Sequence, residues 1–175
     1  MTKIDTERSR ILAIAPTTRG FGFAVLEDGA ILVNWGIRSA EGDKNKQSVA
    51  KVKQLITQYQ PSLFVLQDMK TSFRRSRVRN LSQKLIGVAA ASKVKVAFIS
   101  LEQVRLGLLT DGRGTKDAVA EALVKKFPQE LTPRLPKKRN RPWISEQYNM
   151  GIFDALALAV TYHSFLGHKP FPRRP

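Results

Sequence analysis

Asp154 is the residue whose surroundings most need a chemical explanation, because it interrupts the apolar stretch MGIFDALALAV at 150–160. This stretch predicts a helix that is apolar on almost every side, where a buried carboxylate without a partner would cost several kcal/mol. Asp154 therefore needs a cation, a hydrogen-bond donor or a water-filled cleft. Two interpretations stay open: Asp154 belongs to a functional site in a cleft, or it forms a structural ion pair with an Arg or Lys.

Basic side chains form the second set of chemically active residues. One cluster starts a predicted helix just after the strand that ends in Asp68, so it is expected to flank the end of that strand and neutralise phosphates, with a solvated helix face as the alternative. A second cluster lies in a loop beside Trp143, which is either a stacking platform for a base or a core anchor. Lys116 starts another helix, whose dipole favours a phosphate. The candidate nucleic-acid-binding residues are Arg74, Arg75, Arg77, Arg79, Lys116, Arg134, Lys137, Lys138, Arg139 and Arg141.

The net charge of the chain agrees with these clusters. The 175 residues include 30 Lys and Arg against 14 Asp and Glu, a formal charge of +16. This excess predicts a polyanionic partner, with nucleic acid as the first candidate and an acidic membrane surface as the second. The lack of cysteine excludes disulfides, thiolate metal sites and a cysteine nucleophile, and suits a reducing compartment. The charged N-terminus has no apolar signal core and no stretch reaches membrane-spanning length, so we expect a cytoplasmic protein.

The elements that position these residues follow from apolar periodicity and capping residues. Three β-rich runs joined by short connections predict an antiparallel meander, and later short apolar runs predict covered strands. Apolar residues at helical spacing, with caps such as Thr115, predict the helices. A segment rich in proline and basic residues, 128–143, is expected to be an irregular surface loop. The predicted strands are 11–14, 21–27, 31–37, 62–68 and 95–100, and the predicted helices are 46–59, 72–93, 100–108, 115–127 and 146–166.

This order of elements predicts an α/β fold in one domain at 10–167. An antiparallel three-strand meander followed by alternating helices and strands gives a mixed sheet, with parallel strands added to the meander and helices on both faces. Residues 1–9 are expected to form an N-terminal extension, and residues 168–175 a flexible basic tail.

The order and the motifs resemble those of the RuvC-type Holliday-junction resolvases, which have the ribonuclease H-like fold. The resemblance runs from about Arg10 to Leu166. It rests on ILAIAPTTRGFGFAVLE in the first hairpin, LFVLQD in the fourth strand, DGRGTKDAVAEAL around the start of the penultimate helix and FDALALAVTYH in the last helix. The resemblance also places Lys116 in a region that the resolvases use near DNA.

In that family, acids from the first strand, the fourth strand and the last helix bind two divalent metal ions, Mg²⁺ or Mn²⁺, which activate a water and stabilise the leaving oxygen of a phosphodiester. The corresponding positions here are Ala15, Gln67, Gly151 and Asp154. Ala15 and Gly151 offer no ligand atom, Gln67 keeps a neutral carbonyl oxygen, and Asp154 alone is an acid. The residues at 15 and 67 fit natural divergence as well as deliberate inactivation, since Asp to Ala and Glu to Gln are usual ways to silence a metal nuclease.

Two neighbouring acids are candidate substitutes for the missing ligands. Asp68 directly follows Gln67, although strand alternation sends it to the opposite face unless the strand has ended or bulged. Glu146 precedes Asp154 by roughly 12 Å along a helix axis and some 80° around it. We predict catalytic roles for Asp154, Asp68 and Gln67, and metal ligation by Asp154 and Asp68, with weak metal binding and little hydrolysis.

The sequence thus predicts a nucleic-acid-binding RuvC-like domain that resembles a Holliday-junction-resolving endonuclease, with impaired or absent metal-dependent phosphodiester hydrolysis. The expected ligand is branched DNA, and the resemblance implies a homodimer because a four-way junction presents two symmetric cuts. One alternative is an active Mg²⁺-dependent crossover-junction endodeoxyribonuclease. The other is an assembly protein that binds structured RNA.

Overall fold

A computed structural model of the chain describes residues 9–69, 76–134 and 149–166. Its centre is a five-stranded mixed sheet with the strand order β3-β2-β1-β4-β5. The first three strands form the predicted antiparallel meander, and β4 and β5 extend it as parallel strands. The strands are β1 (Arg10–Thr17), β2 (Gly20–Glu27), β3 (Ile31–Ser39), β4 (Leu63–Gln67) and β5 (Lys95–Ile99).

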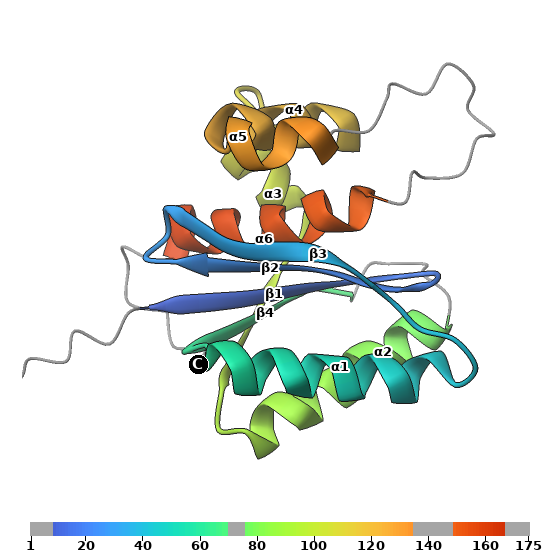
Figure 1. Cartoon of the computed structure of the whole chain (residues 1–175). Coiled ribbons are helices and arrows are strands. Elements are labelled where there is room, and N and C mark those ends of the chain that lie inside the picture. The colour runs from blue at the N-terminus through green and yellow to red at the C-terminus, as the bar shows by residue number, and fades with distance from the viewer. Residues whose placement is uncertain (1–8, 70–75, 135–148, 167–175) are drawn as a thin grey trace, which may run out of the picture.

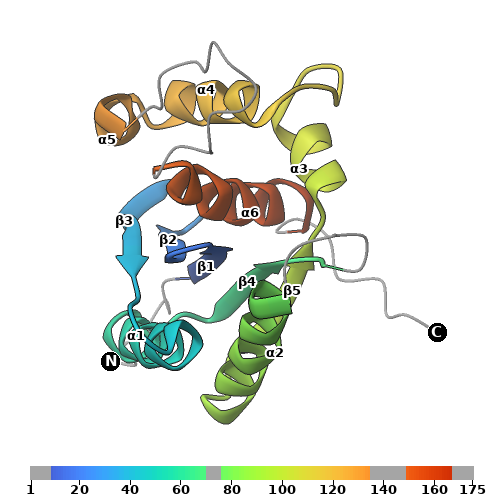
Figure 2. The same ribbon diagram turned by 90° about the vertical axis from the view of Figure 1, so that its right-hand side faces the viewer.

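Helices cover both faces of this sheet, as the sequence predicts. Two helices, α1 and α2, pack on one face, while α6 crosses the other face and α3, α4 and α5 lie around α6 (Figures 1 and 2). The helices are α1 (Lys44–Tyr59), α2 (Ser76–Ala91), α3 (Leu101–Leu108), α4 (Lys116–Lys126), α5 (Pro128–Leu131) and α6 (Met150–Leu166), with a 3-10 turn, η1 (Thr132–Arg134). Within the described ranges, no helix is long and apolar enough to cross a membrane.

Strand alternation divides the apolar residues into two cores. Ile11, Ala13 and Ala15 of β1 face α6 and belong to one core, whereas Leu12 and Ile14 face α1 and α2 and belong to the other. Because both faces of the central strands are covered, β2 is buried along its whole length. The uninterrupted apolar runs of the sequence therefore mark central strands correctly.

The segment after α4 differs from its prediction. Residues 128–134 form α5 and η1, although the sequence predicts an irregular loop from 128. Pro128 suits the first turn of a helix because its missing N–H needs no partner there. Phe127 and Leu131 are buried in the core beside α6, which holds this short helix in place. The description of α6 begins at Met150; the predicted start at 146, with Ser145 as its cap, lies outside the described residues.

Candidate functional site

Three predicted positions converge on the face of the sheet that α6 covers. In the parallel pairing of β1 with β4, Ile14 is opposite Leu66, so one further step brings Ala15 level with Gln67 at the ends of two adjacent strands. Ala15 belongs to the core that includes α6, and Gln67 has the same parity as Leu63 and Val65 of that core. Residues 15 and 67 therefore point toward the helix that carries Asp154.

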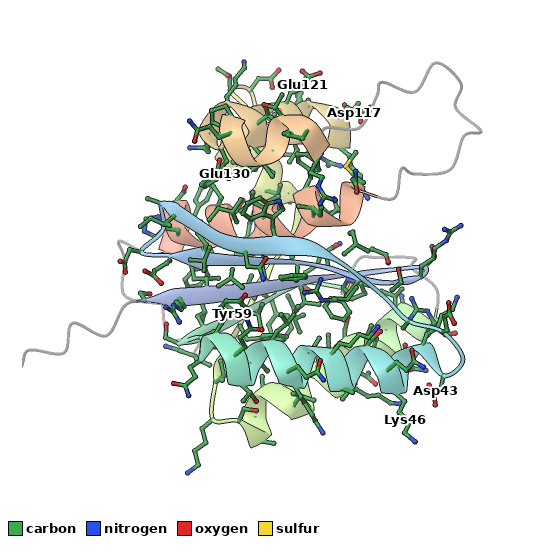
Figure 3. The ribbon with its side chains drawn as sticks, viewed as in Figure 1. Asp43, Lys46, Tyr59, Asp117, Glu121 and Glu130 are labelled. Atoms are coloured by element: carbon green, nitrogen blue, oxygen red, sulfur yellow. The ribbon has the colours of Figure 1, made fainter. Side chains whose placement is uncertain are left out.

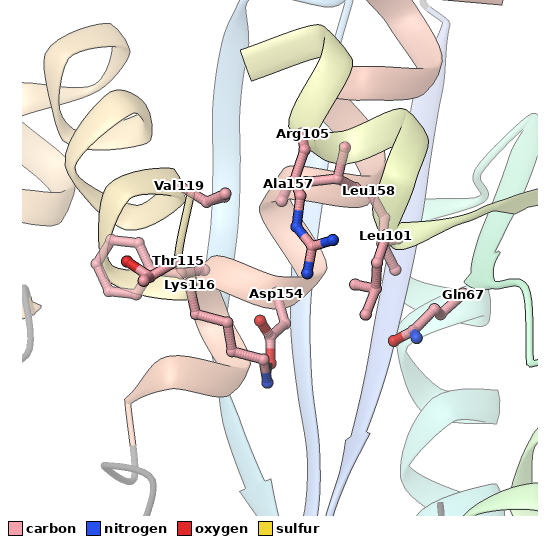
Figure 4. Close-up of a pocket in the computed structure, with 11 residues that line it drawn as sticks. Gln67, Leu101, Arg105, Thr115, Lys116, Val119, Asp154, Ala157 and Leu158 are labelled. Carbon is pink, nitrogen blue, oxygen red and sulfur yellow. Dashed lines mark hydrogen bonds and ion pairs between the residues drawn. The ribbon is translucent and has the colours of Figure 1, made fainter. Parts of the chain in front are cut away.

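Asp154 lies in a recess between α3, α4, α6 and the end of β4 (Figure 4). Polar side chains from all four elements stand around this recess, while its apolar side is lined by residues of the core. The polar lining residues are Gln67, Arg105, Thr115, Lys116 and Asp154, and the apolar ones are Leu101, Val104, Val119, Phe153, Ala157 and Leu158. We call this feature the α6 recess.

Lys116 forms an ion pair with Asp154 across the α6 recess. The distance from Lys116 Nζ to Asp154 Oδ2 is 3.4 Å, and the two side chains are 36% and 23% exposed. Lys116 is held at this place because Thr115 caps α4: its hydroxyl accepts a hydrogen bond from the N–H of Ala118, at 3.2 Å. The structure thus combines the two interpretations of Asp154, since the carboxylate is paired with a lysine and also lines a partly solvated recess.

Arg105 is the recess residue that sequence reasoning missed. Its guanidinium extends into the recess next to the Lys116–Asp154 pair (Figure 4). A capping box fixes the start of α3, in which the Ser100 hydroxyl accepts from the N–H of Gln103 at 3.1 Å and the Gln103 amide oxygen accepts from the N–H of Ser100 at 2.8 Å. The available signal was the position of α3, which follows β5 directly and so begins at the sheet edge where β4 ends. With Arg105, two cations surround one carboxylate.

Gly151, which the family resemblance aligns with a further acid, has a packing role. A Cβ added to Gly22 of β2 would lie 2.1 Å from the carbonyl oxygen of Gly151. A Cβ added to Gly151 would lie 2.9 Å from Ile37 Cδ1 and 2.9 Å from Thr17 Cγ2. Ala15, the strand partner of Gly22, is 4% exposed. These small residues let α6 approach the sheet closely.

The oxygen donors at this place do not fit a two-metal centre. Asp154 supplies one carboxylate and Gln67 one neutral amide, whereas a pair of hard divalent cations requires several charged oxygen ligands. The residues that the structure describes include no group of three or more His, Cys, Asp or Glu side chains able to hold a metal. Asp68 follows the end of β4, is half-buried and does not line the recess; its N–H donates to the carbonyl of Ile99 at 2.9 Å. Its metal-binding role stays a prediction, and Glu146 lies outside the described residues.

Three other predicted nucleic-acid contacts are described by the structure, and none of these three lines the α6 recess. Arg77 and Arg79 lie on α2, across the sheet from α6, and Arg77 donates hydrogen bonds to the Thr17 carbonyl and to Asn45. Arg134 is exposed in η1. The remaining ones, together with Trp143, fall outside the described ranges: Arg74, Arg75, Lys137, Lys138, Arg139 and Arg141.

Comparison with solved structures identifies the fold of the chain. A structure of Thermus thermophilus RuvC covers 89% of this chain and 94% of its own, with a TM-score of 0.64 and 19% sequence identity. The chain has a RuvC-like fold. A second structure, T. thermophilus RuvC in complex with Holliday junction substrate, gives a TM-score of 0.67 at 16% identity and covers 90% of this chain and 94% of that one. No protein-family model and no curated protein matches the sequence. The RuvC-like fold is therefore recognisable in the structure at an identity too low to transfer an activity.

Proposed function

We propose that this chain is a nucleic-acid-binding protein of RuvC-like fold that binds branched DNA without efficient metal-dependent phosphodiester hydrolysis. We propose further that it acts in the cytoplasm as a homodimer. The second T. thermophilus structure supports the choice of ligand, because that RuvC was solved with a Holliday junction on the same fold. The formal charge of +16 supports a polyanionic ligand independently.

The charge arrangement in the α6 recess carries this proposal. The ammonium of Lys116 lies 3.4 Å from Asp154, and the guanidinium of Arg105 extends into the same recess. Two cations and one carboxylate leave an excess positive charge, which attracts a phosphate without help from a metal ion. Gly151 supports the loss of hydrolysis, because it offers no ligand atom at the position that the family resemblance aligns with a further acid on α6.

The proposal is tested by neutralising the two recess cations together, with the variant Arg105→Gln/Lys116→Gln. Each phosphate contact contributes about 0.9 to the slope of log affinity against log salt for B-DNA, so this variant should flatten the slope by up to about 2. The binding of a labelled four-way junction is followed by fluorescence anisotropy over a range of salt concentrations. The matched control is Lys125→Gln/Lys126→Gln, which removes two exposed charges from the other end of α4 and should leave the slope nearly unchanged. An unchanged slope in the recess variant would place the nucleic acid elsewhere.

A cleavage assay tests the first alternative, an active endonuclease, and a comparison of nucleic-acid ligands tests the second, an RNA-binding assembly protein. Nicking of the junction in the presence of Mg²⁺ or Mn²⁺, abolished by Asp154→Asn, would establish the active endonuclease instead. Preferential binding of structured RNA over junction and duplex DNA would establish the RNA-assembly protein. The variant Ala15→Asp/Gln67→Glu places two acids level on β1 and β4, facing Asp154, and a gain of nicking in that variant would indicate a lost nuclease centre.

A further inference from the structure

A second group of cationic side chains gathers at the hairpin end of the sheet. The β1–β2 turn, the end of β3 and the starts of α1 and α2 all lie at this end (Figures 1 and 2). Lys46 projects outward there from the first turn of α1, near Asp43 (Figure 3). We call the group the hairpin patch; its members are Arg19, Arg38, Lys44, Lys46, Lys51 and Arg77.

Backbone carbonyls, which are neutral acceptors, hold three of these cations against the hairpin. Lys44 Nζ donates to the carbonyl of Thr18 at 3.3 Å, Lys51 Nζ donates to the carbonyl of Ser39, and Arg77 donates to the carbonyl of Thr17. These bonds connect α1 and α2 to the β1–β2 turn and to the end of β3. They fix the position of each positive charge without neutralising it.

The positive charge of the Arg77 guanidinium is held at an energetic cost. It is half-buried, and desolvation lowers the pKa of its guanidinium from the ordinary value. Its side-chain partners are the Thr17 carbonyl and Asn45 Oδ1, the latter at 3.0 Å, and both are uncharged. It also lies in the first turn of α2, where the helix dipole disfavours a cation and no acidic residue compensates. An anion bound at this place would offset each of these costs.

Arg38 is oriented by an aromatic ring. Its guanidinium carbon lies 4.7 Å from the centroid of the Phe23 ring, which is fully buried. Gly36, the strand partner of Phe23, leaves room for the guanidinium to cover the ring, since a Cβ at that position would approach Phe23 Cε1 to 3.3 Å and Arg38 Nη1 to 3.7 Å. A stacked guanidinium keeps its N–H groups at the edge, where they can bind a phosphate in two places.

Acids near the patch do not balance its charge. In the part of the chain that the structure describes, none of the six cations has a carboxylate partner within ion-pair distance. Glu41 and Asp43 lie in the loop before α1, and Asp43 caps that helix by accepting from the N–H of Lys46 at 3.1 Å. Asp68 follows β4 at the same end of the sheet, so six cations face three acids and leave a positive surface.

We propose that the hairpin patch is a second phosphate-binding surface, which holds the backbone of another segment of the same nucleic acid that the α6 recess binds. This inference rests on the proposed function for the identity of its ligand. The two surfaces lie on opposite layers of the fold at the same end of the sheet, so one ligand must wrap around that end to reach both (Figure 2). A branched nucleic acid has arms that leave the branch point in different directions, so two of its arms can reach the two surfaces at once.

The surroundings of the patch favour nucleic acid over an anionic membrane. Binding in a membrane interface uses large apolar side chains that enter the lipid beside the basic ones. In the described chain, no exposed large apolar residue lies within four residues of a patch cation along the sequence. These exposed apolar residues are Ile31, Val33, Ile86, Phe98, Leu101, Leu106 and Phe165.

The test neutralises three exposed or half-exposed members of the patch, in the variant Arg19→Gln/Lys44→Gln/Lys46→Gln. Its salt slope for a four-way junction should be flatter by up to about 2.7, from about 0.9 per phosphate contact. The matched control, Lys53→Gln/Lys84→Gln/Lys93→Gln, removes the same charge from exposed positions outside the patch and should change the slope little. Arg19→Glu alone serves as the second variant, because it alters one exposed side chain at the turn and leaves the structural hydrogen bonds in place.

The recess variant Arg105→Gln/Lys116→Gln makes the possible failures distinguishable. If the recess variant flattens the slope and both patch variants match the control, the patch inference is overturned and the proposed function stands. If neither the recess nor the patch affects binding, both are overturned. A patch variant that loses binding to vesicles of anionic phospholipid but keeps its junction slope would assign the patch to a membrane and overturn the inference. A flatter slope in both patch variants, additive with that of the recess variant, supports it.

Discussion

Replacing Asp154 by Asn removes one negative charge from the α6 recess while keeping the shape of the side chain. The carboxylate accepts from Lys116 at 3.4 Å and is 23% exposed, so the change acts on a pair that solvent reaches. In a metal nuclease this substitution would abolish catalysis. In a phosphate-binding recess it should instead strengthen binding.

The effect on stability should be small. Two unit charges at this separation interact by about 1 kcal/mol in bulk water, and side-chain ordering and screening reduce exposed pairs to about 0–1 kcal/mol. Lys116 is more than a third exposed, so the lower part of that range applies. Asp154→Asn should therefore lower Tm by no more than about 4 °C in a chain of this length.

The effect on binding should have the opposite sign. The Asp154 carboxylate repels a phosphate and competes with it for Lys116, so its removal makes one more cation available. A gain of about 1 kcal/mol corresponds to roughly fivefold tighter binding. The salt slope should become steeper by up to about 0.9, the part of one phosphate contact that Lys116 loses to Asp154 in the unchanged protein.

Anisotropy titrations of a labelled four-way junction at several salt concentrations measure both quantities. Asp111→Asn is the matched control, because it removes an exposed carboxylate from the loop after α3 and keeps an oxygen that can accept from the N–H of Arg113. Weaker junction binding by Asp154→Asn, or loss of a Mg²⁺-dependent nicking activity, would refute the metal-free phosphate recess.

Two further predictions concern the scaffold. Gly22→Ala should lower the free energy of unfolding, measured in urea, by about 3 kcal/mol or more, because its added Cβ meets backbone at 2.1 Å. Gly87→Ala, whose added Cβ has no neighbour within 4 Å, should raise that free energy by about 0.5–1 kcal/mol. Equal effects of the two variants would contradict the close contact between α6 and β2. Arg10→Ala should lower the free energy of unfolding by about 2 kcal/mol, because it removes the cation 2.7 Å from Glu27, whose side chain is 7% exposed. The double variant Arg10→Ala/Glu27→Gln should recover part of that loss. An unchanged stability of Arg10→Ala would show that Glu27 does not depend on this pair.

The parts of the fold that depend on burial from both sides could be predicted from the sequence. The run at 62–68 contains four consecutive apolar residues, at 63–66, and the structure forms β4 at 63–67, because a strand is the element that fits so short a run covered on both faces. The short helix α5 could not be predicted. Its four residues are too few for a periodic pattern, and Leu131 is buried in a core that α4 and α6 share with strands distant in sequence.

The candidate site shows the same division. Asp154 and Lys116 were predictable, since one is a charge in an apolar helix and the other starts a capped helix. The direction of a side chain across the fold was not predictable. Arg105 enters the recess because α3 leaves the edge of the sheet toward α6, and Arg77 reaches the β1–β2 turn because α2 packs on the other face. Both facts depend on how helices cross the sheet, which local sequence does not encode.

The contact between Gly22 and Gly151 also limits the evolutionary routes open to this protein. An acid could arise at position 15 or 67 by one substitution, but a side chain at 151 would meet Ile37 Cδ1 and Thr17 Cγ2 at 2.9 Å and would require both side chains to shift. Each intermediate sequence would carry the cost of overpacking before any ligand was gained. A new acid at position 151 of α6 therefore carries a packing cost. A new phosphate-binding residue on the surface carries no such cost, so it is the easier change for this protein to acquire.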